Sequence, residues 1–129
     1  LLENTDDSVK LTLDTGHMLF AQGESIKFLN DFNERVIHIH CKDIRKNVLE
    51  KSLKDDLSFR AAFLEGAFTV PGDGCIDYKP LFDVLNINSY SGWLVVEAEQ
   101  DPKKANPLEY AKIGYNYLYS KIIDNGYSI

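Results

Sequence analysis

Three residues that could bind a metal ion stand at the ends of predicted β-strands. Asp14 ends an alternating apolar and polar segment, His40 lies near the end of a β-branched segment, and Glu97 ends the most apolar segment. Two carboxylates and one imidazole form a ligand set that suits Mn²⁺, Co²⁺, Mg²⁺ or Zn²⁺. A divalent ion would also neutralise carboxylates that are costly to bury side by side. These residue types indicate a metal site, provided that the fold brings the three strand ends together.

Each of these residues also has an ordinary structural explanation. An aspartate at a strand end often forms a turn or caps a helix. The pair His38 and His40 can reflect packing or hydrogen bonding, and Glu97 followed by Glu99 can mark a strand that runs into solvent. The residue pattern by itself leaves both explanations open.

The elements that would position these residues alternate between strand and helix. Period-two and β-branched patterns predict strands over 9–14, 35–42 and 92–97. Helical patterns cover 24–32, 77–85 and 106–121, and 46–66 predicts one or two short helices that end at Gly66. The sequence therefore predicts an α/β protein with a parallel sheet and right-handed crossovers.

Three parallel strands alone would leave two bare sheet edges, so the pattern fits part of a larger fold. A complete (β/α)8 TIM barrel needs ~250 residues, and this chain would supply about three of its βα units. In a barrel, one face of every strand points into the lumen, and active sites lie at the carboxyl ends of the strands. We expect Asp14, His40 and Glu97 to face the lumen at that rim.

Alternation along the second strand predicts which side chains share a face. His38, His40 and Lys42 fall on one face. The opposite, helix-facing side is expected to carry Ile37, Ile39 and Cys41. Cys41 is accordingly expected to be a buried, small apolar residue rather than a nucleophile.

Composition excludes several classes of protein. The chain has 129 residues with 14 Lys and Arg against 20 Asp and Glu, a formal charge of −6 that argues against a nucleic-acid binder. No apolar run approaches the ~20 residues that cross a bilayer, and no charged-then-apolar leader opens the chain. Its start at Leu1, without Met, suggests an internal cut. Two cysteines, Cys41 and Cys75, favour a reducing compartment, so we expect a cytoplasmic protein.

Four stretches of the chain resemble the inosose dehydratase family, namely LDTGH at 13–17, HIHCKD at 38–43, VPGDGCID at 70–77 and GWLVVEAEQDP at 92–102. That family belongs to the xylose isomerase-like barrels, which also include ketose epimerases and hydroxypyruvate isomerase. The resemblance runs over nearly the whole chain and implies that residues 1–129 are the C-terminal part of one barrel domain. The Asp-x-x-His, His-x-His and Gly-Asp-Gly-x-Ile-Asp elements are shared across the superfamily, whereas VEAEQDP and FTVP are closer to the dehydratase.

The resemblance implies a metal centre with four protein ligands. Three of them map to Asp14, His40 and Glu97, with His38 as the competitor of His40. The fourth, a glutamate from an earlier strand, is expected upstream of Leu1, since Glu3 is a poor substitute.

Two further residues are implied as catalytic candidates. His17 resembles the substrate-contacting histidine of the superfamily, and Lys42 stands where a substrate hydroxyl or an enolate could be met. Either residue could bind substrate or transfer a proton.

The implied reaction is the removal of water from 2-keto-myo-inositol (scyllo-inosose), which gives a trihydroxycyclohexane-1,2-dione in inositol catabolism. Mn²⁺ or Co²⁺ is the implied metal, and glutathione is a further candidate cofactor. The expected partner is a small polyol ketone rather than a nucleic acid or a membrane, and a homo-oligomer is the expected assembly.

Two alternatives stay open. A sugar isomerase or epimerase of the same superfamily would use the same metal but return the proton. The other is a truncated half-barrel that is inactive or depends on a complementary chain. With three of four ligands present, we expect the chain alone to bind metal weakly and to associate.

Overall fold

Three parallel strands form the centre of the protein. The computed structural model describes residues 2–127, and the side chain of Glu3 lies outside the described part. The strands are β1 (Leu11–Asp14), β2 (Val36–Cys41) and β5 (Trp93–Val96), in the spatial order β1-β2-β5. Both pairings are parallel, which confirms the predicted α/β arrangement. Each strand is one or two residues shorter at its ends than the pattern predicts.

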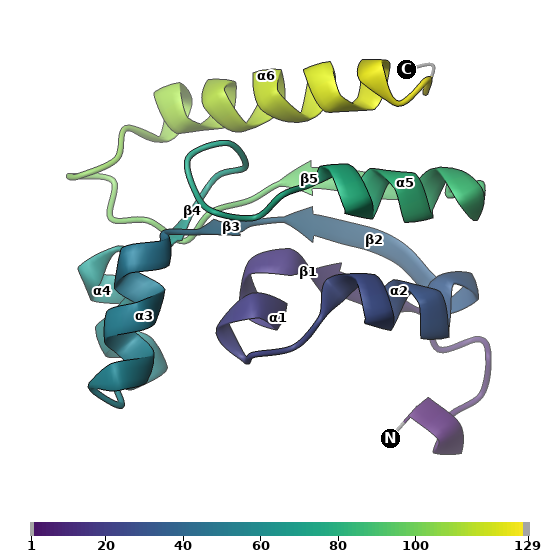
Figure 1. Ribbon diagram of the computed structural model, residues 1–129, viewed down its shortest axis with the longest axis horizontal. Coiled ribbons are helices and arrows are strands. Elements are labelled where there is room, and N and C mark those ends of the chain that lie inside the picture. Colours follow the sequence, from purple (N-terminus) through teal and green to yellow (C-terminus); the bar gives the residue numbers. More distant parts are fainter. Residues whose placement is uncertain (1, 128–129) are drawn as a thin grey trace.

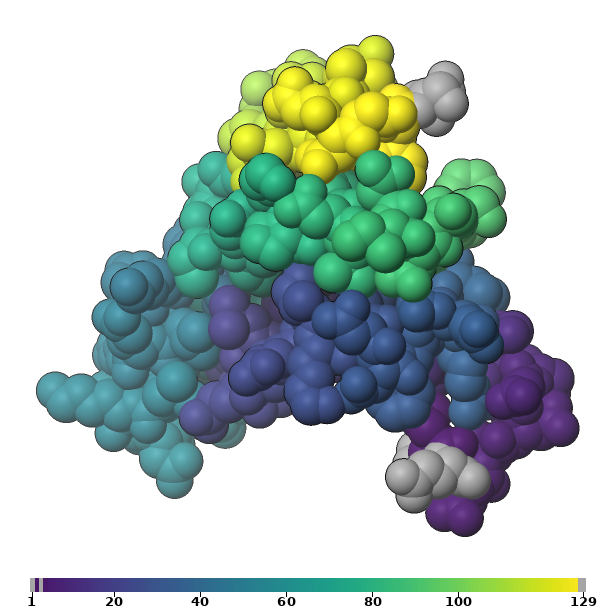
Figure 2. Space-filling model, turned by 45° about the vertical axis from the view of Figure 1, so that its right-hand side comes forward, coloured from purple at the N-terminus to yellow at the C-terminus, as the bar shows by residue number. Residues whose placement is uncertain are grey.

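Helices cover one face of this sheet. They are α2 (Ser25–Phe32), α5 (Lys79–Ile87) and α6 (Pro107–Asp124), which lie side by side, in this order, on the face of the molecule that Figure 2 shows. Leu29, Phe82 and Leu118 reach from these helices into one core with Leu13 and Ile39 of the sheet. The order of strands and covering helices is that of three successive βα units.

Short elements connect these units. A 3₁₀ turn (Leu2–Asn4) precedes β1, α1 (Thr15–Phe20) follows β1 directly, and a second 3₁₀ turn (Asn33–Arg35) leads into β2. The sequence pattern did not predict α1, because its six residues are too few to show a helical period. No helix among residues 2–127 is long and apolar enough to cross a membrane.

A separate unit is inserted after β2. It comprises β3 (Asp43–Ile44), α3 (Lys46–Lys54), α4 (Phe59–Glu65) and β4 (Phe68–Thr69). The prediction of one or two short helices over 46–66 is confirmed with two helices, and Gly66 ends α4 at φ 85°, a left-handed conformation that glycine adopts without strain. The antiparallel pairing of β3 with β4 was not predicted. Figure 1 shows that α3 and α4 lie beyond the carboxyl ends of the central strands.

For one residue of β2, the prediction of which sheet face its side chain occupies is wrong. Strict alternation puts Ile37 on the helix-facing side with Ile39, yet Ile37 is 50% exposed while Val36 is 3% exposed. The pairing with β1 shifts register here, since Leu11 lies opposite Val36 and the next residue, Thr12, lies opposite His38. The irregularity places Val36 in the core and turns Ile37 outward, whereas Ile39 and Cys41 are buried as predicted.

The two cysteines provide a test of these strand faces. Burial raises the pKa of the Cys41 thiol to about 12, whereas Cys75 lies exposed in the loop before α5. At about pH 8 a maleimide should modify Cys75 at least about 100-fold faster than Cys41, whose thiol is accessible only in opened forms. Peptide mapping by mass spectrometry gives both rates, and the Cys75→Ser variant isolates the Cys41 rate. Equal rates would mean that Cys41 does not face the core.

Candidate metal centre

Asp14, His40 and Glu97 converge at the carboxyl ends of three neighbouring strands. One potential ligand atom from each lies within 4.8 Å of the other two. His40 Nδ1 is 3.6 Å from Asp14 Oδ2 and 3.9 Å from Glu97 Oε2. Atoms bound to one ion at about 2.2 Å lie roughly 3–4.4 Å apart, so these separations suit a shared ion. Within residues 2–127 the group that could hold an ion contains His40 and not His38, whose ring lies 5.1 Å from that of His40.

Strand register and a helix cap produce this convergence. Asp14 lies directly opposite His40 in the parallel pairing of β1 with β2. Glu97 follows β5, and its backbone N–H donates to the carbonyl oxygen of Cys41 at 3.4 Å. Asp14 is also the N-cap of α1, because its Oδ1 accepts from the backbone N–H of His17 at 2.9 Å. The cap uses one carboxylate oxygen and leaves Oδ2 to the cluster, so the two explanations of Asp14 are compatible.

The state of Glu97 supports a cation at this point. Its Oε2 is inaccessible to solvent and forms an ion pair with Lys42 Nζ at 2.7 Å. A carboxylate oxygen removed from water requires a positive partner, because an isolated buried charge is costly. A divalent ion would satisfy this oxygen, and the mixed oxygen and nitrogen donor set fits Mn²⁺, Co²⁺ or Zn²⁺.

Lys42 brings a buried positive charge to the same cluster. Its side chain is 1% exposed, and Nζ lies 3.1 Å from Glu99 Oε2 and 3.2 Å from Asp14 Oδ2. Burial acts to lower the pKa of this ammonium, but its contacts with Glu97, Glu99 and Asp14 outweigh burial and raise the pKa above its usual value. Lys42 is therefore a permanent cation at neutral pH.

His17 completes the cluster from α1. Its Nε2 lies 2.8 Å from Glu99 Oε2 and 2.9 Å from Lys42 Nζ. With a proton, Nε2 donates to Glu99; without one, it accepts from Lys42. The ring packs edge-on against Phe59 of α4 and Phe68 of β4, with centroids 5.5 and 5.2 Å away. The inserted unit thus forms an apolar wall beside the polar cluster.

The structure brings together all five residues that the sequence singled out for chemistry, and it places Glu99, for which the sequence left an outer-site role and a solvated position open, in the same cluster. Burial acts to raise the pKa of the Glu99 carboxyl, but contacts with His17 and Lys42 lower it below the usual value. Its signal in the sequence is its position two residues after Glu97, which places it on the same face. That signal also fits a solvated strand end, and only the contacts decide between the two.

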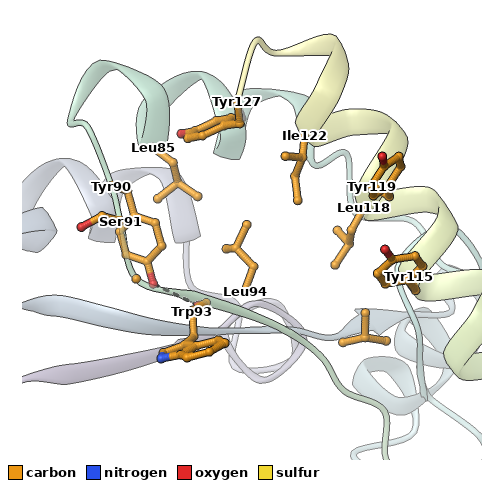
Figure 3. Close-up of a pocket in the computed structure, with 12 residues that line it drawn as sticks. Leu85, Tyr90, Ser91, Trp93, Leu94, Tyr115, Leu118, Tyr119, Ile122 and Tyr127 are labelled. Carbon is orange, nitrogen blue, oxygen red and sulfur yellow. Dashed lines mark hydrogen bonds between the residues drawn. The ribbon is translucent and has the colours of Figure 1, made fainter. Parts of the chain in front are cut away.

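A large apolar cavity lies elsewhere in the molecule. Its volume is about 530 Å³, and it lies beside β5 against α6, as Figure 3 shows. Leu94, Leu118 and Ile122 belong to its lining, and Trp93 beside them is 73% exposed. Among the described residues, its lining contains no carboxylate, histidine or cysteine.

The comparisons with known proteins agree with this architecture. Residues 1–121 match the profile of a family described as "Xylose isomerase-like TIM barrel". The chain belongs to this family. The parallel strands and their helices are accordingly part of a xylose isomerase-like barrel, which confirms the predicted fold class.

Individual relatives add to the family match. The chain is similar to the inosose dehydratases of Lactiplantibacillus plantarum (48% identity over 126 residues), Clostridium beijerinckii (50% over 122) and Bacillus velezensis (46% over 125). The alignments cover 94–97% of this chain but 41–42% of those proteins. The predicted resemblance is confirmed, and the chain spans about two fifths of the length of these relatives.

Metal titration tests the three-residue centre of this xylose isomerase-like chain. Asp14→Asn, His40→Ala and Glu97→Gln should each weaken Mn²⁺ binding by more than about tenfold, because each removes a proposed ligand. His38→Ala is the matched control on the same strand and should change the affinity less than about twofold. The electron paramagnetic resonance signal of free Mn²⁺ gives the dissociation constants. If His38→Ala weakens binding more than His40→Ala, the imidazole has been assigned to the wrong histidine.

Proposed function

We propose that this chain supplies part of the active site of a metal-dependent hydro-lyase. The proposed reaction is the dehydration of 2-keto-myo-inositol (scyllo-inosose) to a trihydroxycyclohexane-1,2-dione in myo-inositol catabolism. The observation that carries the proposal is the meeting of Asp14, His40 and Glu97 within 4.8 Å at the carboxyl ends of barrel strands. Similarity to proteins named inosose dehydratase supports the choice of substrate and of reaction.

This reaction makes two physical demands on the site. A proton beside a ketone is weakly acidic, so the negative charge that develops on the ketone oxygen must be stabilised. A hydroxyl group must then leave as water, which requires a proton donor. A bound Mn²⁺ or Co²⁺, held by Asp14, His40 and Glu97, would supply a Lewis acid for the ketone oxygen.

Lys42 and His17 fit different parts of this chemistry. Lys42 is buried and kept protonated by carboxylates, which suits it to stabilise negative charge rather than to accept a proton. The His17 side chain is 41% exposed, so its ring can be reached from solvent, and an imidazole is a common acid–base group in catalysis. Phe59 and Phe68 pack edge-on against this ring and help to orient it. We assign charge stabilisation to Lys42 and proton transfer to His17.

Three further parts of the proposal rest on the sequence. They are a cytoplasmic location, glutathione as an additional cofactor and self-association of the chain. They stay predictions.

An assay with scyllo-inosose tests the proposed reaction. With Mn²⁺ present, mass spectrometry of the products should show loss of one water and formation of the diketone. His17→Ala and Lys42→Ala should each lower kcat by ~10²–10⁴-fold, the usual contribution of one acid–base or charge-stabilising group. His38→Ala is the control and should retain most of the activity.

Two other outcomes have distinct meanings. A product with the same mass as the substrate would replace the dehydratase by an isomerase or epimerase of the same superfamily. Mn²⁺ binding without turnover of any ketose or inosose would favour the half-barrel that needs a complementary chain.

A further inference from the structure

We infer that Lys42 occupies part of the metal site until an ion binds, and that Glu99 is the positioning residue that retains the ammonium afterwards. The inference rests on the proposed metal centre and assigns to two neighbouring residues a role in controlling its affinity. The observation behind it is that one ammonium group contacts a carboxylate oxygen of two of the three candidate ligands.

Four polar atoms lie within 3.2 Å of Lys42 Nζ. They are Glu97 Oε2 at 2.7 Å, His17 Nε2 at 2.9 Å, Glu99 Oε2 at 3.1 Å and Asp14 Oδ2 at 3.2 Å. Three of these atoms are carboxylate oxygens, one for each N–H of the ammonium group, and His17 Nε2 accepts from it only when that nitrogen carries no proton. Lys42 therefore balances the charge of the cluster in the place where an ion would do so.

The ammonium and a divalent ion compete for the same two oxygens. Asp14 Oδ2 and Glu97 Oε2 lie 3.6 and 3.9 Å from His40 Nδ1, and both also contact Lys42 Nζ. Two cations cannot share these oxygens at close range without strong mutual repulsion in a partly buried site. Binding of an ion therefore requires Nζ to withdraw from Asp14 and Glu97.

Glu99 is the carboxylate to which the ammonium can withdraw. It already contacts Nζ, and it lies outside the group of ligand atoms that could hold the ion. The rest of Lys42 is fixed, because its carbonyl oxygen accepts from Thr15 Oγ1 at 2.6 Å and from the Tyr78 hydroxyl at 2.9 Å. Gly16 packs so closely on the stem that an added Cβ would lie 2.7 Å from Lys42 Cγ. Only the ammonium end can move, so Glu99 keeps it beside the site as the ion enters.

A double-mutant cycle on Mn²⁺ affinity tests this role in the full 129-residue chain. Lys42→Met removes the competing cation and should tighten Mn²⁺ binding by about tenfold, a typical coupling between two sites. Glu99→Gln removes the alternative partner and should weaken binding by about tenfold when Lys42 is present. In the Lys42→Met background, Glu99→Gln should change the affinity less than about twofold, so the two effects are not additive. Glu109→Gln, on the exposed face of α6, is the matched control for the loss of one negative charge.

Other results of this double-mutant cycle would contradict the inference. If Glu99→Gln weakens binding equally with and without Lys42, Glu99 acts on the ion directly and the inference is wrong. It is also wrong if Lys42→Met weakens Mn²⁺ binding. Asp14→Asn distinguishes failure of the inference about Lys42 and Glu99 from failure of the metal centre on which it rests. Unchanged Mn²⁺ binding in this variant contradicts the proposed metal centre itself. Far-UV circular dichroism checks folding, and Lys42→Gln replaces Lys42→Met if methionine is not tolerated at this position.

Discussion

The mutual repulsion of carboxylates at one edge of a parallel sheet is the constraint on which the rest of the site depends. Asp14, Glu97 and Glu99 meet around Lys42, whose ammonium is almost completely removed from solvent. Carboxylates brought together in a partly buried place require a cation, and the fold supplies one from the neighbouring strand. The contacts of Thr15 and Tyr78 with the Lys42 backbone hold that strand end in place. Charge balance, strand register and helix capping therefore specify the same arrangement.

The sequence predicts those features that depend on local periodicity. Alternation along each strand puts Asp14, His40 and Glu97 on one face, and the parallel order of strands brings them together as expected. Periodicity fails at Ile37, because a register shift against β1 depends on pairing with a distant segment. The two-residue strands β3 and β4 could not be predicted from periodicity either, because each is defined only by its pairing with the other. Glu99 is ambiguous in the sequence, since only its distances to His17 and Lys42 distinguish it from a solvated residue.

The partial barrel accounts for the apolar surface along the outer strand. The chain spans about two fifths of the length of its dehydratase relatives, and β5 forms an edge of the three-stranded sheet. Trp93 is largely exposed on that strand, and the apolar cavity beside α6 lies at the same edge. A closed barrel has no such edge, because each strand there has two neighbours. The three candidate ligands, in contrast, already lie within 4.8 Å of one another in this chain, so β1, β2 and β5 are sufficient to bring them together.

Crystals of the protein grown with Mn²⁺ and measured near the manganese absorption edge test the central claim most directly. The account predicts an anomalous peak within about 2.5 Å of Asp14, His40 and Glu97, the range of metal–ligand bonds in proteins. It also predicts that Lys42 Nζ has moved from Asp14 and Glu97 toward Glu99. A peak at any other place, or saturating Mn²⁺ with these three side chains unchanged and no peak between them, would contradict it.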